Sequence, residues 1–150
     1  AFYMGKKRIV TKLAEDTSLI GEKMSSLSQK SVSSKAISKG RIYIRVSYNN
    51  TQMVITDANG NVLGWASAGA LGFKGPKKAT PYAASKVAEV IMQKLEKLGM
   101  KSADVYIEGI GSGRQTAIYS LATHGLNIDL IKDITPVPHN GPKPPNPRRV

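Results

Sequence analysis

A short basic loop in the middle of the chain combines residue types that bind phosphate. The run from Gly72 to Lys78 contains three lysines and no acidic residue. It leads into Thr80-Pro81, a pair typical of a helix start, with threonine as the N-cap and proline at the first helical position. Free backbone N–H groups and the positive end of a helix dipole attract anions. We therefore predict phosphate contacts here, and a solvated loop without a ligand is the simpler alternative.

Two aromatic residues stand close to this loop in the sequence, Trp65 before it and Phe73 within it. Aromatic rings can stack on the unpaired bases of RNA, but they are also common residues of hydrophobic cores. We predict a core position for Trp65 and leave both roles open for Phe73.

A second loop, from Gly109 to Arg114, is rich in glycine and ends in an arginine. Its pattern is G-x-G-x-G, which differs from the G-x-G-x-x-G fingerprint of dinucleotide-binding folds, and Asp129 is poorly suited as the ribose partner. Small residues still allow a phosphate to approach the backbone, and Arg114 could hold it with a bidentate guanidinium contact. The alternative is a tight strand-to-helix turn that needs glycine only for its geometry.

No arrangement of side chains meets the requirements of an active site. His124 is expected at a helix end, and His139 lies in a proline-rich segment. The carboxylates are scattered over strand ends without metal-ligand spacing, and no serine or threonine lies in a nucleophile-elbow context. These carboxylates are Asp57, Asp104, Glu108, Asp129 and Asp133. We predict that the protein is not an enzyme and uses neither a cofactor nor a metal.

The charge balance indicates a polyanionic partner. Of 150 residues, 22 are lysine or arginine and 10 are aspartate or glutamate, which gives a formal net charge of +12. Such an excess favours nucleic acid or an anionic membrane. The membrane is the weaker choice, because no apolar run has the length of a spanning helix and the amphipathic segment 80–98 has a polar face of mixed sign. The absence of cysteine agrees with a reducing compartment.

Composition divides the chain into three parts. Residues 1–39 are rich in serine and lysine, and we expect an extension with a short helix around Thr17–Leu27 but no secretory signal or transit peptide. Residues 40–135 carry the regular patterns of a folded domain. Residues 136–150 form a proline-rich basic tail without acids. Proline favours an extended, semi-stiff backbone, so the tail could reach roughly 45 Å at about 3.1 Å per residue.

Hydrophobic periodicity predicts a strand meander at the start of the domain. Apolar and polar side chains alternate over 41–48, which is typical of a strand with one buried face. Further strands are expected at 51–57 and 62–68, with a turn at Asn49-Asn50 and a hairpin signal at 58–61. Connections this short favour three antiparallel strands.

The second half of the domain alternates helices and strands. A helix is expected over 80–98, with an apolar stripe of helical period, and a strand at 104–108. The stripe comprises Ala84, Val87, Ala88, Ile91, Leu95 and Leu98. The second helix should open with a capping box of Ser112 and Gln115, and the last strand should cover 128–134. The order β-β-β-α-β-α-β indicates an α/β domain with helices packed on a mixed sheet.

These segments contain motifs that together resemble a known family. In chain order the motifs are Ser47-Tyr48-Asn49-Asn50-Thr51, Ile55-Thr56-Asp57 with Gly60-Asn61, Leu63-Gly64-Trp65-Ala66, Gly72-Phe73-Lys74-Gly75 with Thr80-Pro81-Tyr82-Ala83-Ala84, the loop Gly109 to Arg114, and Asp133-Ile134-Thr135-Pro136 with Pro138-His139-Asn140-Gly141. In order and spacing they resemble the S-eleven family of small-subunit ribosomal proteins, over residues 40–150. The His-Asn-Gly ending is similar to that of the bacterial and organellar branch.

The resemblance implies a ribonuclease-H-like α/β fold without catalysis, here with basic arms at both ends. It implies a structural constituent of the small ribosomal subunit that binds small-subunit rRNA in the platform and supports assembly and the mRNA exit region. The implied partners are rRNA, the platform proteins of families seven, eighteen and twenty-one, and mRNA near the exit channel, with no membrane. The implied location is a cytoplasmic bacterial ribosome, ahead of an organellar one.

By position, the resemblance also implies a set of RNA-contacting residues in the loops and the tail. The set comprises Asn49, Asn50, Lys74, Lys77, Lys78, Gly111, Ser112, Gly113, Arg114, His139, Asn140, Gly141, Lys143, Arg148 and Arg149. An RNA-binding regulator that acts away from the ribosome would use the same surfaces, and it is the alternative function.

The chain departs from the family pattern in three places. The extension before Gly40 is longer than usual, and Ile110 and Ser112 stand where prolines are usual, so the glycine loop should be less stiff. Asn146-Pro147 stands where lysines are common, so the tail should hold RNA less strongly. The Asn140-Gly141 pair is flexible and unhindered, and we expect it to rearrange to isoaspartate.

Overall fold

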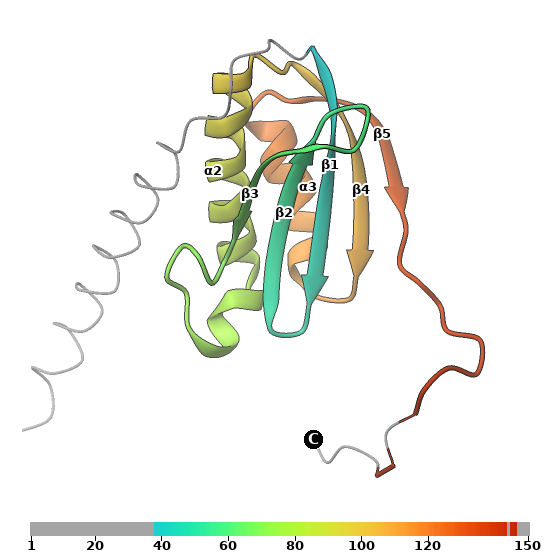
Figure 1. The fold of residues 1–150 in the computed structure, drawn as a ribbon. Helices are drawn as coiled ribbons and strands as arrows, with labels where there is room; N and C mark the ends of the chain where they lie inside the picture. Colours follow the sequence, from blue (N-terminus) through green and yellow to red (C-terminus); the bar gives the residue numbers. More distant parts are fainter. Residues whose placement is uncertain (1–37, 144, 147–150) are drawn as a thin grey trace, which may run out of the picture.

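Five strands form one mixed sheet, and two α-helices cover one of its faces (Figure 1). The computed structural model describes residues 38–143 and 145–146. The elements in chain order are β1 (Lys39–Ser47), β2 (Asn50–Thr56), β3 (Val62–Ser67), the 3-10 helix η1 (Gly75–Ala79), α2 (Pro81–Leu98), β4 (Ser102–Gly109), α3 (Gly113–Thr123) and β5 (Asn127–Asp133). The strands lie in the order β3-β2-β1-β4-β5. This confirms the predicted α/β fold with its ribonuclease-H-like mixed sheet.

Strand β1 lies in the centre of the sheet and sets the register of both halves. It pairs antiparallel with β2, with Ile42 opposite Ile55, and parallel with β4, with Ile42 opposite Val105. Alternate residues of β1 are buried under the helices, as the period of two requires. Strands β1, β2 and β3 form the expected antiparallel meander, and β4 and β5 extend the sheet in parallel.

Helix α2 begins and ends as its sequence predicts. Thr80 accepts a hydrogen bond at Oγ1 from the backbone N–H of Ala83 at 3.3 Å, and Pro81 is the first helical residue. Gly99 ends the helix with a left-handed φ of 71°, a conformation that glycine adopts without strain. All six residues of the predicted apolar stripe are buried against the sheet and α3. This helix therefore supplies much of the core.

Two local predictions are wrong, and both have a geometric reason. Trp65 is 49% exposed, because it lies opposite Val54 on the face away from the helices, while its neighbour Ala66 takes the buried face. The capping box is absent. Ser112 already has helical backbone angles, and its Oγ donates to Ala79 O at 3.0 Å. The side chain of Gln115 donates to the Tyr119 hydroxyl at 3.2 Å instead.

The predicted basic loop contains a short helix, η1, that the sequence did not indicate. The expected helix around Thr17–Leu27 lies outside the described residues, as do Arg148 and Arg149. Among the residues that are described, no helix has the length and apolar character needed to cross a membrane.

The face of the sheet opposite the helices carries paired charges and aromatic rings. The rings of Tyr43 and Tyr106 stack with their centroids 5.1 Å apart. Nζ of Lys39 lies 2.9 Å from Asp129 Oδ2 and 3.2 Å from Asp104 Oδ1, and the hydrogen bonds to Asp129 and then Asp104 raise the pKa of this lysine. The charge of Lys39 on this face is therefore balanced by two carboxylates.

Candidate nucleic-acid interface

The loops predicted to bind RNA meet at one end of the domain. Strands β1 and β4 run in parallel and finish there, at Ser47 and Gly109, and both α-helices begin there (Figure 1). This end, the loop cluster, contains Asn49, Asn50, Lys74, Lys77, Lys78, Gly111, Ser112, Gly113 and Arg114. The hydrogen bond from Ser112 Oγ to Ala79 O joins the glycine loop to η1. The basic loop and the glycine loop, which are far apart in the sequence, are thus neighbours in the structure.

The lysine loop, residues 72–78, is anchored by a buried aromatic ring and exposes its lysines to solvent. Phe73 is buried and meets the ring of Tyr82 edge-on, with centroids 6.1 Å apart, so its role is to anchor the loop. Lys74 and Lys77 are exposed and Lys78 is partly exposed. Within residues 38–143, no carboxylate forms an ion pair with these three lysines. The first turn of α2 contains no acidic residue, so the anion-attracting end of that helix is also uncompensated.

The glycines of the second loop are required by close packing. Gly109 has a φ of 93°, and a Cβ atom there would lie 1.9 Å from Val46 O. A Cβ atom at Gly111 would lie 2.6 Å from Val46 Cγ1, and one at Gly113 would lie 3.0 Å from Thr51 Oγ1. The loop therefore presses directly on the end of β1 and on the start of β2. This supports the geometric explanation of the glycines, and phosphate approach to this loop stays a prediction.

Arg114 joins the glycine loop to the last strand. Its Nη1 donates to Gly109 O and, at 3.2 Å, to Thr135 Oγ1, while Nη2 donates to Asp133 Oδ2. The guanidinium group is therefore engaged within the protein, and a bidentate contact with phosphate is a prediction that would require these bonds to rearrange. No local pattern indicates this bridge, because Asp133 and Thr135 are about twenty residues from Arg114 and meet it only through the sheet.

Asp133 and Thr135 fix the start of the C-terminal tail. Asp133 Oδ1 accepts hydrogen bonds from the backbone N–H of Thr135 at 2.9 Å and from its hydroxyl group at 2.5 Å. The Thr135 hydroxyl oxygen accepts in turn from the backbone N–H of Gly109 at 3.1 Å. The bonds from Thr135, together with the Arg114 guanidinium, lower the pKa of Asp133 to about 2.

The tail leaves this end of the domain beyond β5 and extends away from the sheet (Figure 1). Residues 134–143 form no helix or strand. His139, Asn140, Gly141 and Lys143 lie in this segment, apart from the loop cluster, and Asn140 has a positive φ of 54°. The structure thus assembles one group of the predicted RNA-contacting residues and leaves the tail residues as a separate arm.

Each carboxylate considered for catalysis has a structural partner. Asp57 accepts hydrogen bonds from Asn59 and Asn61 in the β2–β3 hairpin, and the Asn61 side chain is the main cause of its lowered pKa. The other four, Asp104, Glu108, Asp129 and Asp133, form ion pairs with Lys39, Arg45, Lys39 and Arg114. Across the described ranges, no group of three or more histidine, aspartate or glutamate side chains is arranged to hold a metal ion.

An open α/β sheet that presents at one end a cluster of lysines, unpaired within residues 38–143, has the charge distribution expected of a nucleic-acid-binding protein. The family described as Ribosomal protein S11 matches residues 40–149. The chain therefore belongs to the ribosomal protein S11 family, which confirms the resemblance and makes it a structural ribosomal protein and not an enzyme.

Relatives from different sources are similar over most of their length. The chain is 51% identical to small ribosomal subunit protein uS11c of Mesostigma viride over 116 residues, which cover 77% of this chain and 89% of the relative. It is 50% identical over 125 residues to uS11 of Helicobacter pylori strain P12, covering 83% and 95%. It is 49% identical over 117 residues to uS11 of Sulfurovum sp. strain NBC37-1, covering 77% and 94%.

Proposed function

We propose that this protein is a structural constituent of the small ribosomal subunit that binds platform rRNA, supports platform assembly and borders the mRNA exit region. The observation that carries the proposal is the loop cluster, which places three lysines beside the start of α2, with no carboxylate of residues 38–143 paired to them. Family membership supplies the ribosomal setting.

The distribution of charge supports one RNA-facing end. Lys74, Lys77 and Lys78 lie on the loop cluster, whereas two cations of the open sheet face, Lys39 and Arg45, are neutralised by carboxylates. Lysines that neutralise phosphates release condensed counterions, and this makes binding strongly dependent on salt. Contacts of this kind position the protein on the shape of the RNA and do not read its sequence.

The tail, whose start is held by side-chain hydrogen bonds, supports a second rRNA contact farther from the domain. Arg114, Asp133 and Thr135 set the direction in which the chain leaves β5. Beyond this point the tail carries Lys143, Arg148 and Arg149 and no acidic residue. A stiff basic arm that starts beside the loop cluster would hold a neighbouring rRNA helix in register with the helix bound by the loops.

The neighbours and the compartment are part of the same proposal. We place the protein beside the platform proteins of families seven, eighteen and twenty-one, with mRNA close to the tail. A cytoplasmic bacterial ribosome is proposed, as the Helicobacter and Sulfurovum relatives support, and the uS11c relative supports an organellar ribosome as the second choice.

Fractionation of a native lysate tests the proposal directly. A sucrose gradient at low magnesium separates the two subunits, and an antibody against this chain then locates it. We expect migration with the small subunit that survives moderate salt. A peak at the top of the gradient, with bound RNA, would instead establish a regulator that acts away from the ribosome.

A further inference from the structure

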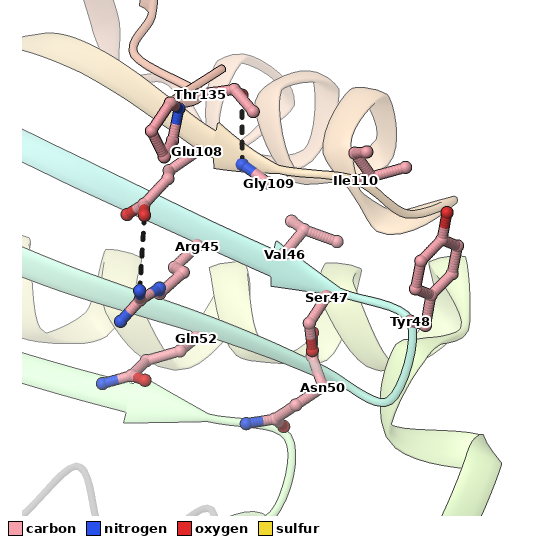
Figure 2. A pocket seen from close by; sticks show the side chains of 11 residues that line it. Arg45, Val46, Ser47, Tyr48, Asn50, Gln52, Glu108, Gly109, Ile110 and Thr135 are labelled. Atoms are coloured by element: carbon pink, nitrogen blue, oxygen red, sulfur yellow. Dashed lines mark hydrogen bonds and ion pairs between the residues drawn. The ribbon is translucent and has the colours of Figure 1, made fainter. Parts of the chain in front are cut away.

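A pocket of about 420 Å³ opens on the face of the sheet opposite the helices, where β1 and β4 end (Figure 2). Its walls also include the first residues of β2 and the start of the tail at Thr135 and Pro136. Its volume is within the range of small-ligand sites, roughly 300–1,000 Å³. We propose that this pocket receives the base of one unstacked RNA nucleotide, an inference that rests on the proposed function.

The rim of the pocket carries apolar surface that the fold leaves uncovered. Tyr48 is 76% exposed and Ile110 is 60% exposed, and both line the pocket together with the ring of Pro136. In Figure 2, Tyr48 and Ile110 lie at the same end of the pocket. Proteins that bind single-stranded RNA bury splayed bases against aromatic and apolar side chains of this kind.

The charges in the pocket favour a base over a phosphate. Arg45 Nη2 lies 3.3 Å from Glu108 Oε1, so the guanidinium group that lines the pocket is already paired with a carboxylate (Figure 2). A phosphate would be repelled by Glu108, whereas a base presents donors to the carboxylate and acceptors to the guanidinium. The amide of Gln52 adds one further donor and acceptor.

A buried oxygen atom in the pocket wall has no donor. Asn50 lines the pocket, and its Oδ1 is buried without a hydrogen-bond partner among the described residues. An unsatisfied buried acceptor is costly, and such atoms in native proteins often mark a site that a ligand completes. Rotation of the Asn50 amide toward the pocket would offer it to an exocyclic amine or a ribose 2′-hydroxyl group.

The position of the pocket agrees with this occupant. It lies between two proposed RNA contacts, the turn at Asn49-Asn50 and the tail that begins at Thr135. Phosphates held by the loop cluster and by the tail would flank a nucleotide at this place. The pocket would thus hold one base of the RNA, while phosphate contacts of the lysines orient the protein on the RNA without reading its sequence.

The test removes the pocket contacts without changing charge. Tyr48→Ala combined with Gln52→Leu removes the ring and the amide, and Tyr119→Ala, at a residue that is 62% exposed on α3 and outside the pocket, is the matched control. Binding of the full chain to a full-length small-subunit rRNA transcript is measured at several salt concentrations. We expect the double variant to bind about tenfold or more weakly with an unchanged salt slope, and the control to match wild type.

Probing of the transcript with dimethyl sulfate gives a second readout. One unpaired base should be protected by the wild type and the control and reactive in the double variant. Equal affinity and equal protection for all three proteins would overturn the pocket assignment, leave the ribosomal function intact and favour a polypeptide occupant. Failure of the wild type to bind rRNA would overturn both. Because Tyr48 is exposed, Tyr48→Ala alone decides the question if the double variant does not fold.

Discussion

Arg114 at the start of α3 donates a hydrogen bond from Nη2 to Oδ2 of Asp133, the last residue of β5. The same guanidinium group also reaches Gly109 O, at the end of β4. Three elements that finish or begin at this end of the domain are therefore joined by one side chain, and the tail starts from that junction.

The first prediction concerns the free energy of this ion pair. Arg114→Gln and Asp133→Asn should each destabilise the protein, and the double variant should lose less than the sum of the two. The coupling should be small, since the two side chains are 28% and 54% exposed and solvent screens their attraction. Urea denaturation of the four proteins measures it. Strictly additive losses would mean that the pair contributes nothing.

The second prediction concerns the pH dependence of the stability that Asp133 contributes at the start of the tail. The pKa of Asp133 is about 2 in the folded protein, below its ordinary value of 3.8. Its hydrogen bonds therefore stabilise the fold fully above about pH 3.8, and that contribution is lost as the pH falls toward 2. A carbon-detected NMR titration of the Asp133 carboxyl group should show this midpoint. Thr135→Val removes the hydroxyl donor and should raise the titration midpoint of Asp133. An unchanged midpoint would show that this hydroxyl does not lower the pKa of Asp133.

The third prediction separates the cost of close packing from the cost of backbone conformation. Gly60 and Gly109 share a φ of 93°, but of the two only Gly109 faces a neighbouring atom, Val46 O, at the place where a Cβ atom would lie. Gly60→Ala should destabilise by about 1–2 kcal/mol through its backbone alone. Gly109→Ala should lose a further 1–3 kcal/mol, roughly, from the clash. Thermal unfolding compares them, and equal losses would show that the loop can move away from β1.

The fourth prediction concerns the salt dependence of rRNA binding. Lys74→Gln with Lys77→Gln should weaken binding and flatten the slope of log affinity against log salt by roughly 0.7–0.9 for each phosphate that the protein no longer neutralises. Lys97→Gln with Lys101→Gln is the control, since both residues are exposed at the opposite end of the domain. Arg148→Ala with Arg149→Ala should flatten the slope as well. A change as large in the control as in the loop variant would argue against a phosphate-binding end.

The fifth prediction concerns the backbone at Asn140-Gly141, which lies outside every helix and strand. We expect isoaspartate to form at Asn140 during long incubation of the free protein, because nothing regular restrains the pair. Gly141→Ala should slow the reaction, since a side chain hinders it. Peptide mapping by mass spectrometry measures both, and only unmodified Asn140 in the wild type would refute the expectation.

Helix α2 and strand β1 were predictable because their hydrophobic periods are regular. The six-residue stripe of α2 and the alternation of β1 give the core faces directly, and the loop chemistry indicated which loop carries three lysines. Trp65 was misplaced because a large apolar side chain suggests a core position, whereas the period of two that buries Ala66 and Ala68 puts Trp65 on the opposite face.

The candidate site was predictable in its residue types and less so in its contacts. Glycine and lysine loops have local signatures, whereas the bridge from Arg114 to Asp133 exists only because β5 pairs in parallel beside β4. The pocket residues Arg45 and Gln52 were also missed. They lie inside strands, at positions where the sequence indicates only a solvent-facing side chain.

The parallel pairing of β4 and β5 has a mechanical consequence for the tail. The tail continues from the end of β5, so a pull on the tail in the direction of β5 acts along the strand axis. Such a force acts on the β4–β5 hydrogen bonds together, in shear, and cannot open them one at a time as a zipper opens. An arm anchored in this way resists tension along the strand axis without peeling the edge strand away from the domain.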